Sequence, residues 1–290
     1  MNKIGESELI INSDGSIFHL KLKPEHIAKD IILVGDPGRV AMISDFFDKV
    51  EHVISNREFI THTGTYKGKR ISVIATGIGT DNIDIVLNEL DALVNIDLHN
   101  RIIKEKKTIL NFIRIGTSGA LHEDIEVDSF LLSEMAVGFD GLLNFYANRN
   151  SVCNTEMENA FKNHTNWNPL LTSPYFVKSS KELSEKIGKG IQRGITISAP
   201  GFYGPQGRVL RLQIQDPEIN DKIRSFRYND KRITNYEMES SALFGLSALL
   251  GHQAATVCVI IANRYAKKYS KDYKPAVKNL IKHVLDNLVE

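Results

Sequence analysis

The stretch ILVGDPGRV, residues 32–40, is an apolar run that ends directly in a turn shaped by glycine and proline. Short runs rich in Ile and Val recur along the chain, and several are followed by a glycine turn and then by a helical pattern. This alternation is typical of mostly parallel sheets, and runs without polar alternation indicate strands covered on both faces. The sequence therefore predicts an α/β fold with a mostly parallel, twisted central mixed sheet flanked by helices.

The expected elements follow from the spacing of the apolar residues. Strands are predicted at residues 31–34, 71–75, 109–115, 130–137, 195–198 and 256–261. Apolar residues at three-to-four spacing predict helices at 81–94, 181–188, 235–250 and 275–289, with Asn235 as the N-cap of the third. The polar segment 153–174 indicates a surface excursion rather than a linker, so residues 1–290 are expected to form a single domain.

The charge balance excludes several classes of partner. The chain has 36 basic and 35 acidic residues, and this formal net charge of +1 gives no electrostatic case for binding nucleic acid or an anionic membrane surface. The longest apolar run, 254–262, is about half of what a membrane span needs, and the first twenty residues hold no signal-peptide apolar segment. Cys153 and Cys258 fit neither a metal-knuckle spacing nor a disulfide framework, so we expect a cytoplasmic protein without membrane or nucleic-acid partners.

Ligands in such sheets bind beyond the carboxyl ends of the strands, and two glycine turns at such ends are candidate ligand sites. The turn from Gly35 to Gly38 precedes Arg39, and glycine amides with a planar guanidinium suit a phosphate; an ordinary tight turn with an exposed arginine is the alternative. The segment ATGIGTDN, residues 75–82, has Asn82 where a dinucleotide fingerprint has its third glycine. Close packing of strand on helix is therefore favoured there over a nicotinamide site.

In FIRIGTSGAL, residues 112–121, Arg114 interrupts an apolar strand immediately before a glycine-rich segment. A buried guanidinium without a partner costs several kcal/mol, so it requires a counter-charge. Either a protein carboxylate or a bound anion would serve, and Thr117 and Ser118 could donate hydroxyl hydrogen bonds to the same anion.

Two further segments carry polar groups. The loop ISAPGFYGPQGRVLR, residues 197–211, combines the aromatic face of Phe202 with the amide of Gln206 and the guanidinium of Arg208, which a planar heterocycle could use, although such a loop is more often plain surface. In NYEMES, residues 235–240, Glu237 and Glu239 are two apart and cannot share a helix face. One is expected to point inward and the other to solvent, and ordinary acids at a helix start are the alternative.

These segments, in this order, resemble the nucleoside phosphorylase family and within it the uridine phosphorylases, from Phe18 of FHLKL to Arg264 of IIANR. The resemblance implies a pentosyltransferase that cleaves a nucleoside with inorganic phosphate as co-substrate and needs no other cofactor. It also implies a homodimer with shared active sites, or a hexamer of such dimers.

The resemblance assigns roles to individual residues. The implied phosphate site consists of Gly35, Arg39, Arg114 and Thr117, together with Arg57 of SNREF from a neighbouring subunit. His19 is similar to a family histidine that crosses the same interface to the ribose. The rest of the implied nucleoside site is Thr117, Phe202, Gln206, Arg208, Glu237, Met238, Glu239 and Arg264, and the catalytic roles fall to Arg39, Arg114 and Glu239.

Substrate choice depends on a few positions. Gln206 and Arg208 can address the carbonyls and N3 of a pyrimidine, and Asn263 stands where purine-specific relatives have an aspartate, which favours uridine over inosine. A purine phosphorylase, a hydrolase of the same superfamily and a catalytically silent nucleoside-binding protein remain as alternatives. Some relatives hold an interfacial potassium ion near the positions of Glu58, Ile78 and Asn82, but Asn82 departs from their pattern and we expect no metal site.

Overall fold

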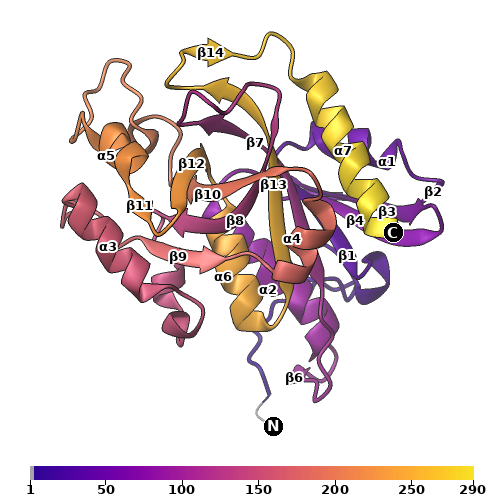
Figure 1. Cartoon of the computed structure of the whole chain (residues 1–290). Coiled ribbons are helices and arrows are strands. Elements are labelled where there is room, and N and C mark those ends of the chain that lie inside the picture. Colours follow the sequence, from indigo (N-terminus) through magenta and orange to yellow (C-terminus); the bar gives the residue numbers. More distant parts are fainter. Residues whose placement is uncertain (1–2) are drawn as a thin grey trace.

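A computed structural model describes residues 3–290, which form one large twelve-stranded sheet with helices on both faces and a small separate two-stranded sheet (Figure 1). The strands are β1 (Asp30–Val34), β2 (Lys49–Asn56), β3 (Phe59–Tyr66), β4 (Lys69–Ala75), β5 (Ile96–Asp97), β6 (Ile102–Ile103), β7 (Asn111–Ala120), β8 (Phe130–Gly138), β9 (Tyr175–Lys178), β10 (Gln192–Ser198), β11 (Arg227–Tyr228), β12 (Lys231–Glu237), β13 (Gln253–Asn263) and β14 (Lys268–Tyr269). The α-helices are α1 (Gly38–Ser44), α2 (Thr80–Asn95), α3 (Thr155–Thr165), α4 (Lys181–Ile187), α5 (Ile219–Ser225), α6 (Ser240–Leu250) and α7 (Lys274–Val289).

The large sheet is mixed, with a mostly parallel centre. Its strand order is β11-β12-β10-β8-β13-β7-β1-β4-β3-β2, with β9 added to β8 and β14 to β13. The pairs β10–β12, β10–β8, β13–β7, β1–β7 and β1–β4 are parallel, whereas β13–β8 and the β2–β3–β4 meander are antiparallel. The predicted fold class is therefore confirmed.

One extra pairing closes part of this sheet on itself. The end of β12 pairs antiparallel with the end of β7, where Asn235 faces Ala120 and Tyr236 faces Gly119. The strands β7, β13, β8, β10 and β12 thus make a closed ring, which we call the five-strand ring. Ring closure brings the carboxyl ends of β7, β10 and β12 together, although they are far apart in sequence.

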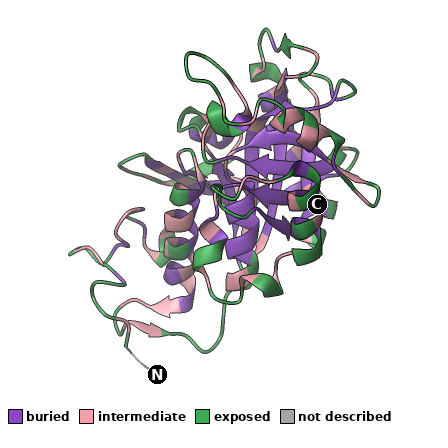
Figure 2. Cartoon of the chain, turned by 90° about the vertical axis from the view of Figure 1, so that its left-hand side faces the viewer, coloured by how far each residue is buried: buried purple, intermediate pink, exposed green. Residues whose placement is uncertain are grey.

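Helices cover the sheet on opposite faces, and each face has its own apolar core. The first core includes the inward residues of α2 and α6, which lie side by side (Figure 1), and the second includes those of α1, α4 and α7. In α2 the apolar residues Ile83, Val86, Leu87 and Leu90 recur at the spacing of one helix face and are fully buried. Figure 2 shows the resulting buried sheet between exposed helix surfaces and loops.

All six predicted strands are present, but the two segments next to the expected site differ from prediction. Strand β7 continues to Ala120, so residues 116–119 are extended strand and not a turn. The predicted helix 235–250 begins only at Ser240, with Glu239 at its N-cap, and Asn235 is a buried residue of β12. The prediction of Asn235 as a helix cap is therefore wrong, because Asn235 pairs with β10 and β7 and belongs to the sheet.

The polar segment 153–174 is more ordered than expected. It contains α3, whose N-cap Asn154 accepts a hydrogen bond of 3.0 Å from the Met157 amide, a contact that stabilises a helix by about 1 kcal/mol. Phe161 of this helix is fully buried and packs with Trp167 and Phe226 in a third, aromatic cluster. No helix among residues 3–290 combines the length and apolar character that crossing a bilayer would require.

Candidate functional site

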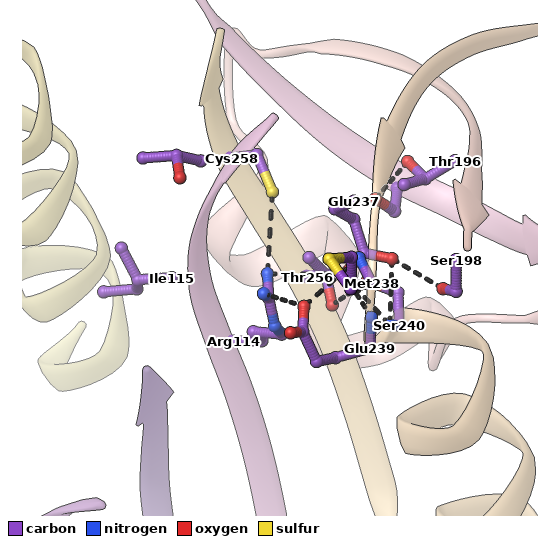
Figure 3. A network of polar contacts seen from close by, with 12 residues as sticks. Arg114, Ile115, Thr196, Ser198, Glu237, Met238, Glu239, Ser240, Thr256 and Cys258 are labelled. Carbon is purple, nitrogen blue, oxygen red and sulfur yellow. Dashed lines mark hydrogen bonds and ion pairs between the residues drawn. The ribbon is translucent and has the colours of Figure 1, made fainter. Parts of the chain in front are cut away.

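The ends of the ring strands gather a buried arginine and two buried glutamates (Figure 3). Arg114 of β7 places Nη1 3.4 Å from Oε2 of Glu237, the last residue of β12, and its Nη2 donates to Oε2 of Glu239. All three side chains are almost completely buried. Burial alone would lower the pKa of Arg114, but the carboxylates of Glu239 and Glu237 outweigh it and raise that pKa above its ordinary value.

Gly116 makes room for this arginine. Side chains two residues apart on a strand lie on the same face, so Arg114 extends along β7 over position 116. A Cβ at Gly116 would collide with Nη1 of Arg114 and would lie 2.8 Å from Sγ of Cys258 on β13. Glycine is therefore required here for close approach of a guanidinium to the sheet.

Glu237 is held by the protein on both of its oxygens. Oε1 accepts a hydrogen bond of 2.5 Å from Oγ of Ser198 on β10, and the backbone amides of Glu239 and Ser240 donate to the carboxylate at 3.0–3.1 Å. These amides are at the start of α6, so Glu237 also caps this helix. The expectation that one of the two glutamates points to solvent is wrong, because both precede the helix and turn toward Arg114.

Glu239 links the ring to the turn ATGIGTDN. Its Oε1 accepts from the amide of Gly79 at 2.9 Å, at a backbone φ of +103° that favours glycine. Each carboxylate oxygen has two lone pairs. Oε2 already accepts from Arg114 and from the Met238 amide, so Oε1 is the oxygen that keeps acceptor capacity for a further donor. Met238 lies half-buried between the two glutamates.

The first glycine turn lies beside this cluster. Arg39, in the first turn of α1, donates from Nη1 to the Ile115 carbonyl at 3.3 Å and from Nη2 to Oγ1 of Thr117 at 3.5 Å. A Cβ on Gly35 would lie 3.3 Å from the carbonyl of Gly77, so the two glycine turns are neighbours. The structure therefore brings together the four expected phosphate residues of this chain, Gly35, Arg39, Thr117 and Arg114.

Arg39 lacks a close carboxylate. Its nearest acid, Asp36, is 4.0 Å from Nε and has 59% of its side chain exposed. Burial lowers the pKa of Arg39, and the positive charge of Arg114 lowers it further. On β7, Nε of Arg114 and Oγ of Ser118 are buried, and neither has a hydrogen-bond partner within residues 3–290. The hydrogen-bonded nitrogens of Arg39 thus point at neutral oxygens, and Nε of Arg114 and Oγ of Ser118 at no acceptor within residues 3–290.

Arg57 and His19 form a separate group. Arg57 is exposed in the β2–β3 turn, at a φ of +54°, with its guanidinium carbon 5.4 Å from the ring centre of Phe18. His19 bonds through Nδ1 to Oε1 of Glu89 at 2.6 Å. In the described part of the chain, neither makes a hydrogen bond or ion pair with Arg39, Arg114 or Thr117.

Four expected residues meet around the loop that follows β10. Gln206 is buried, its Oε1 accepts from Nη1 of Arg208, and its main-chain carbonyl accepts from Nη1 of Arg264. The guanidinium carbon of Arg208 lies 3.8 Å from the ring centre of Phe202, which is 51% exposed. Burial, and then the charge of Arg264, lowers the pKa of Arg208 to about 10.

Several groups at the site were not expected from the sequence. Ser198 and Gly79 hold the two glutamates, and Asn220 and Tyr236 contact the loop that carries Gln206. Ser198 ends a predicted strand, so the rule about carboxyl ends could have indicated it. The other contacts arise from tertiary packing and leave no local signal.

The remaining candidate positions are the residues near the potassium position of some relatives and two surface hollows. Glu58, Ile78 and Asn82 lie around Gly77, and Nδ2 of Asn82 donates to the Ile78 carbonyl at 3.4 Å. Residues 3–290 contain no group of three His, Cys, Asp or Glu side chains placed to bind a metal. Two open hollows of about 1020 and 620 Å³ lie elsewhere, one beside α5 and one beside the β5–β6 hairpin.

The sequence and the fold of this chain are similar to those of known proteins. The family model described as the phosphorylase superfamily matches residues 29–289. A uridine phosphorylase from Thermococcus kodakarensis is 30% identical over 270 residues, which cover 91% of this chain and 83% of that protein. A DeoD-type purine nucleoside phosphorylase from Colwellia psychrerythraea is 26% identical over 243 residues, covering 83% and 85%. The crystal structure of a Trypanosoma brucei nucleoside phosphorylase that shows uridine phosphorylase activity matches with a TM-score of 0.89 and 32% identity, covering 97% and 99% of the two chains.

Proposed function

The chain belongs to the phosphorylase superfamily, and on this premise we propose that it is a nucleoside phosphorylase that converts uridine and phosphate into uracil and ribose 1-phosphate. The observation that carries the choice of uridine is the polar edge formed by Gln206 and Arg208. The choice of phosphate as co-substrate is supported by the arginines Arg39 and Arg114 beside two glycine turns.

The polar edge complements uracil in its hydrogen-bonding pattern. Oε1 of Gln206 accepts from Arg208 and keeps a second lone pair, while Nε2 of Gln206 and the guanidinium nitrogens of Arg208 are donors on either side of it. The resulting order is donor, acceptor, donor. Uracil presents the reverse order along O2, N3–H and O4, so the base fits this edge with each group paired.

A purine substrate finds less support. Both polar atoms of the Asn263 side chain are hydrogen-bonded to the backbone. Nδ2 donates to the carbonyls of His122 at 2.7 Å and Ile125 at 2.8 Å, and Oδ1 accepts from the amide of Ala266 at 2.8 Å. An amide cannot protonate a purine ring nitrogen, and the Asn263 amide is already hydrogen-bonded to the backbone of neighbouring loops.

In the proposed reaction an oxygen of phosphate attacks C1′ of the nucleoside on the face opposite the base. The C1′–O bond forms as the bond from C1′ to N1 of uracil breaks, and the electron pair of that bond leaves with the base, which then takes a proton from solvent. Charge builds up on the departing base in the transition state, where Arg208 and Gln206 would stabilise it. Oε1 of Glu239 keeps a free lone pair with which to accept from a sugar hydroxyl.

The arginines would act chiefly by orientation. A phosphate held by Arg39, Arg114, the Gly35 turn and Thr117 loses its translational freedom on binding, before the chemical step. We propose that Arg57 and His19 complete the site of a neighbouring subunit, since Arg57 is exposed, His19 is partly exposed, both lie beside Phe18, and neither bonds to this chain's own cluster within residues 3–290. This makes the active form a homodimer, alone or within a hexamer. Both cysteines are free, which suits a reducing cytoplasm.

A phosphorolysis assay over uridine, thymidine and inosine, each with and without phosphate, tests the proposal. We expect uracil release from uridine that depends on phosphate and exceeds cleavage of inosine. Release without phosphate would indicate a hydrolase, faster cleavage of inosine would indicate a purine phosphorylase, and uridine binding without turnover would indicate a silent binding protein. Each of these three outcomes contradicts the proposal.

A further inference from the structure

We propose that Asn220 is a positioning residue for base recognition, which holds the Gln206–Gly207 peptide and thereby aims the Gln206 amide at the substrate. This role rests on the proposed function. Asn220 is the second residue of α5 and does not belong to the loop that it contacts.

The contact is made on the backbone of the loop. Nδ2 of Asn220 donates to the Gln206 carbonyl at 3.4 Å, and the same carbonyl accepts from Arg264. Gly207 has a φ of +68°, and its missing Cβ would collide with the Asn220 amide. The loop therefore passes Asn220 at a distance that only glycine permits, and the asparagine fixes the peptide from one side while Arg264 fixes it from the other.

The orientation of the Asn220 amide is set by Tyr236. The Tyr236 hydroxyl donates to Oδ1 of Asn220 at 3.0 Å, so Nδ2 is the atom that faces Gln206. Burial raises the pKa of Tyr236, which keeps the phenol protonated and able to donate. Tyr236 is a buried residue of β12, next to Glu237, and the Arg264 guanidinium lies 5.6 Å from its ring centre.

These contacts form a relay from the five-strand ring to the base edge: Tyr236 orients Asn220, Asn220 holds the Gln206 peptide, and the Gln206 amide meets the base. The segment 207–217 has no regular secondary structure and exposes Leu210 and Leu212. Anchoring to the ring therefore compensates for the lack of order within the loop. Because Arg264 still holds the carbonyl when Asn220 is removed, the loop should stay folded but point the amide less accurately.

The experiment compares Asn220→Ala, Tyr236→Phe and the double variant with the wild type, using uridine and phosphate as varied substrates. Losing one hydrogen bond that orients the amide should lower kcat/KM for uridine about tenfold, mainly through KM for uridine, with KM for phosphate unchanged. Tyr236→Phe keeps the ring and should give about a threefold loss. The double variant should be no worse than Asn220→Ala, because the hydroxyl acts only through Asn220.

Glu218→Ala is the matched control, since Glu218 occupies the N-cap position of α5 with an exposed side chain that makes no capping hydrogen bond and none to Gln206. Thermal unfolding of each variant verifies folding. Three outcomes would overturn the role of Asn220 and leave the proposed function intact. They are wild-type kinetics in Asn220→Ala, a rise in KM for phosphate equal to that for uridine, and additive losses in the double variant. A wild type without phosphate-dependent uracil release would overturn the proposed function and, with it, this role.

Discussion

The two sides of the site hold their arginines in different ways. On the side that we propose to bind phosphate, Arg114 lies on a strand of the ring and is paired with the buried carboxylates of Glu237 and Glu239. On the side that we propose to bind the base, Arg208 and Arg264 donate to carbonyl and amide oxygens and lie near aromatic rings. Breaking a buried ion pair leaves an uncompensated charge, whereas removing a guanidinium from neutral acceptors does not. Function and stability should therefore be coupled at Arg114 and separable at Arg208 and Arg264.

The largest effect is expected for Arg114→Ala. From the sequence alone this change should impair phosphate use far more than folding, but the ion pairs of Arg114 revise that expectation. Removal of the guanidinium leaves two buried carboxylates facing each other, which should cost about 3–5 kcal/mol of unfolding free energy in addition to phosphorolysis. Urea unfolding measures the loss, and adding Glu239→Gln should restore part of it. An unfolding midpoint equal to that of the wild type would show that the carboxylates do not depend on Arg114.

Arg208→Ala tests the other side. Losing one donor to the charged leaving base should lower kcat/KM for uridine about 100-fold, whereas unfolding free energy should change by less than about 1 kcal/mol. Steady-state kinetics and urea unfolding on the same preparation provide both numbers. Arg211→Ala, at an exposed position in the same loop, is the matched control. A stability loss as large as that of Arg114→Ala would remove the contrast between the two sides.

Asn263→Asp tests whether the residue at position 263 determines the choice between uridine and inosine. The change replaces a donor to two backbone carbonyls by a carboxylate oxygen, so it should destabilise the protein by about 1–3 kcal/mol and add no inosine cleavage. Thermal unfolding and the inosine assay check the two parts. A gain in inosine cleavage would mean that the residue reaches the base after all.

The smallest effect is expected at Asp140, a carboxylate near α6 that has no arginine beside it. It accepts hydrogen bonds of 2.8 Å from Tyr175, Ser241 and the Leu142 amide, and burial nevertheless raises its pKa. A raised pKa means that the folded protein binds this proton more tightly than the unfolded chain does, so stability falls as pH rises through the folded value.

Asp140→Asn removes that titration. The variant should therefore gain stability relative to the wild type with rising pH, by about 1 kcal/mol, and the gain should vanish below the unfolded pKa of an aspartate. Urea unfolding from about pH 3, below the ordinary aspartate pKa of about 3.9, to about pH 7 measures it. A difference that does not vary with pH would contradict the assignment.

The parts of the fold that could be predicted from the sequence are those with a strong local pattern. Runs such as 31–34 and 256–261 are apolar enough to be strands in any context, and α2 and α7 have clear apolar faces. The segment 235–239 has helical spacing, and only pairing with β10 and β7 makes it a strand and a bend. The sequence indicates that Arg114 needs a counter-charge. It does not identify Glu239 as the partner, because Glu239 is 125 residues away along the chain.

The base side divides in the same way. Phe202, Gln206 and Arg208 share one short loop, so their proximity could be predicted from the sequence. The contact of Asn220 with that loop depends on where α5 packs against β12, and neither segment carries a pattern that indicates this.

The five-strand ring also constrains the order in which the protein can fold. The first part of β7, residues 111–114, has its neighbour β1 available early, yet the carboxylates that neutralise Arg114 belong to residues 237 and 239. During synthesis, a ribosome must add more than a hundred residues before that charge can leave water at low cost. Contacts of such long sequence separation slow folding, so the end of β7 should acquire its native protection from hydrogen exchange only when β12 and β13 dock.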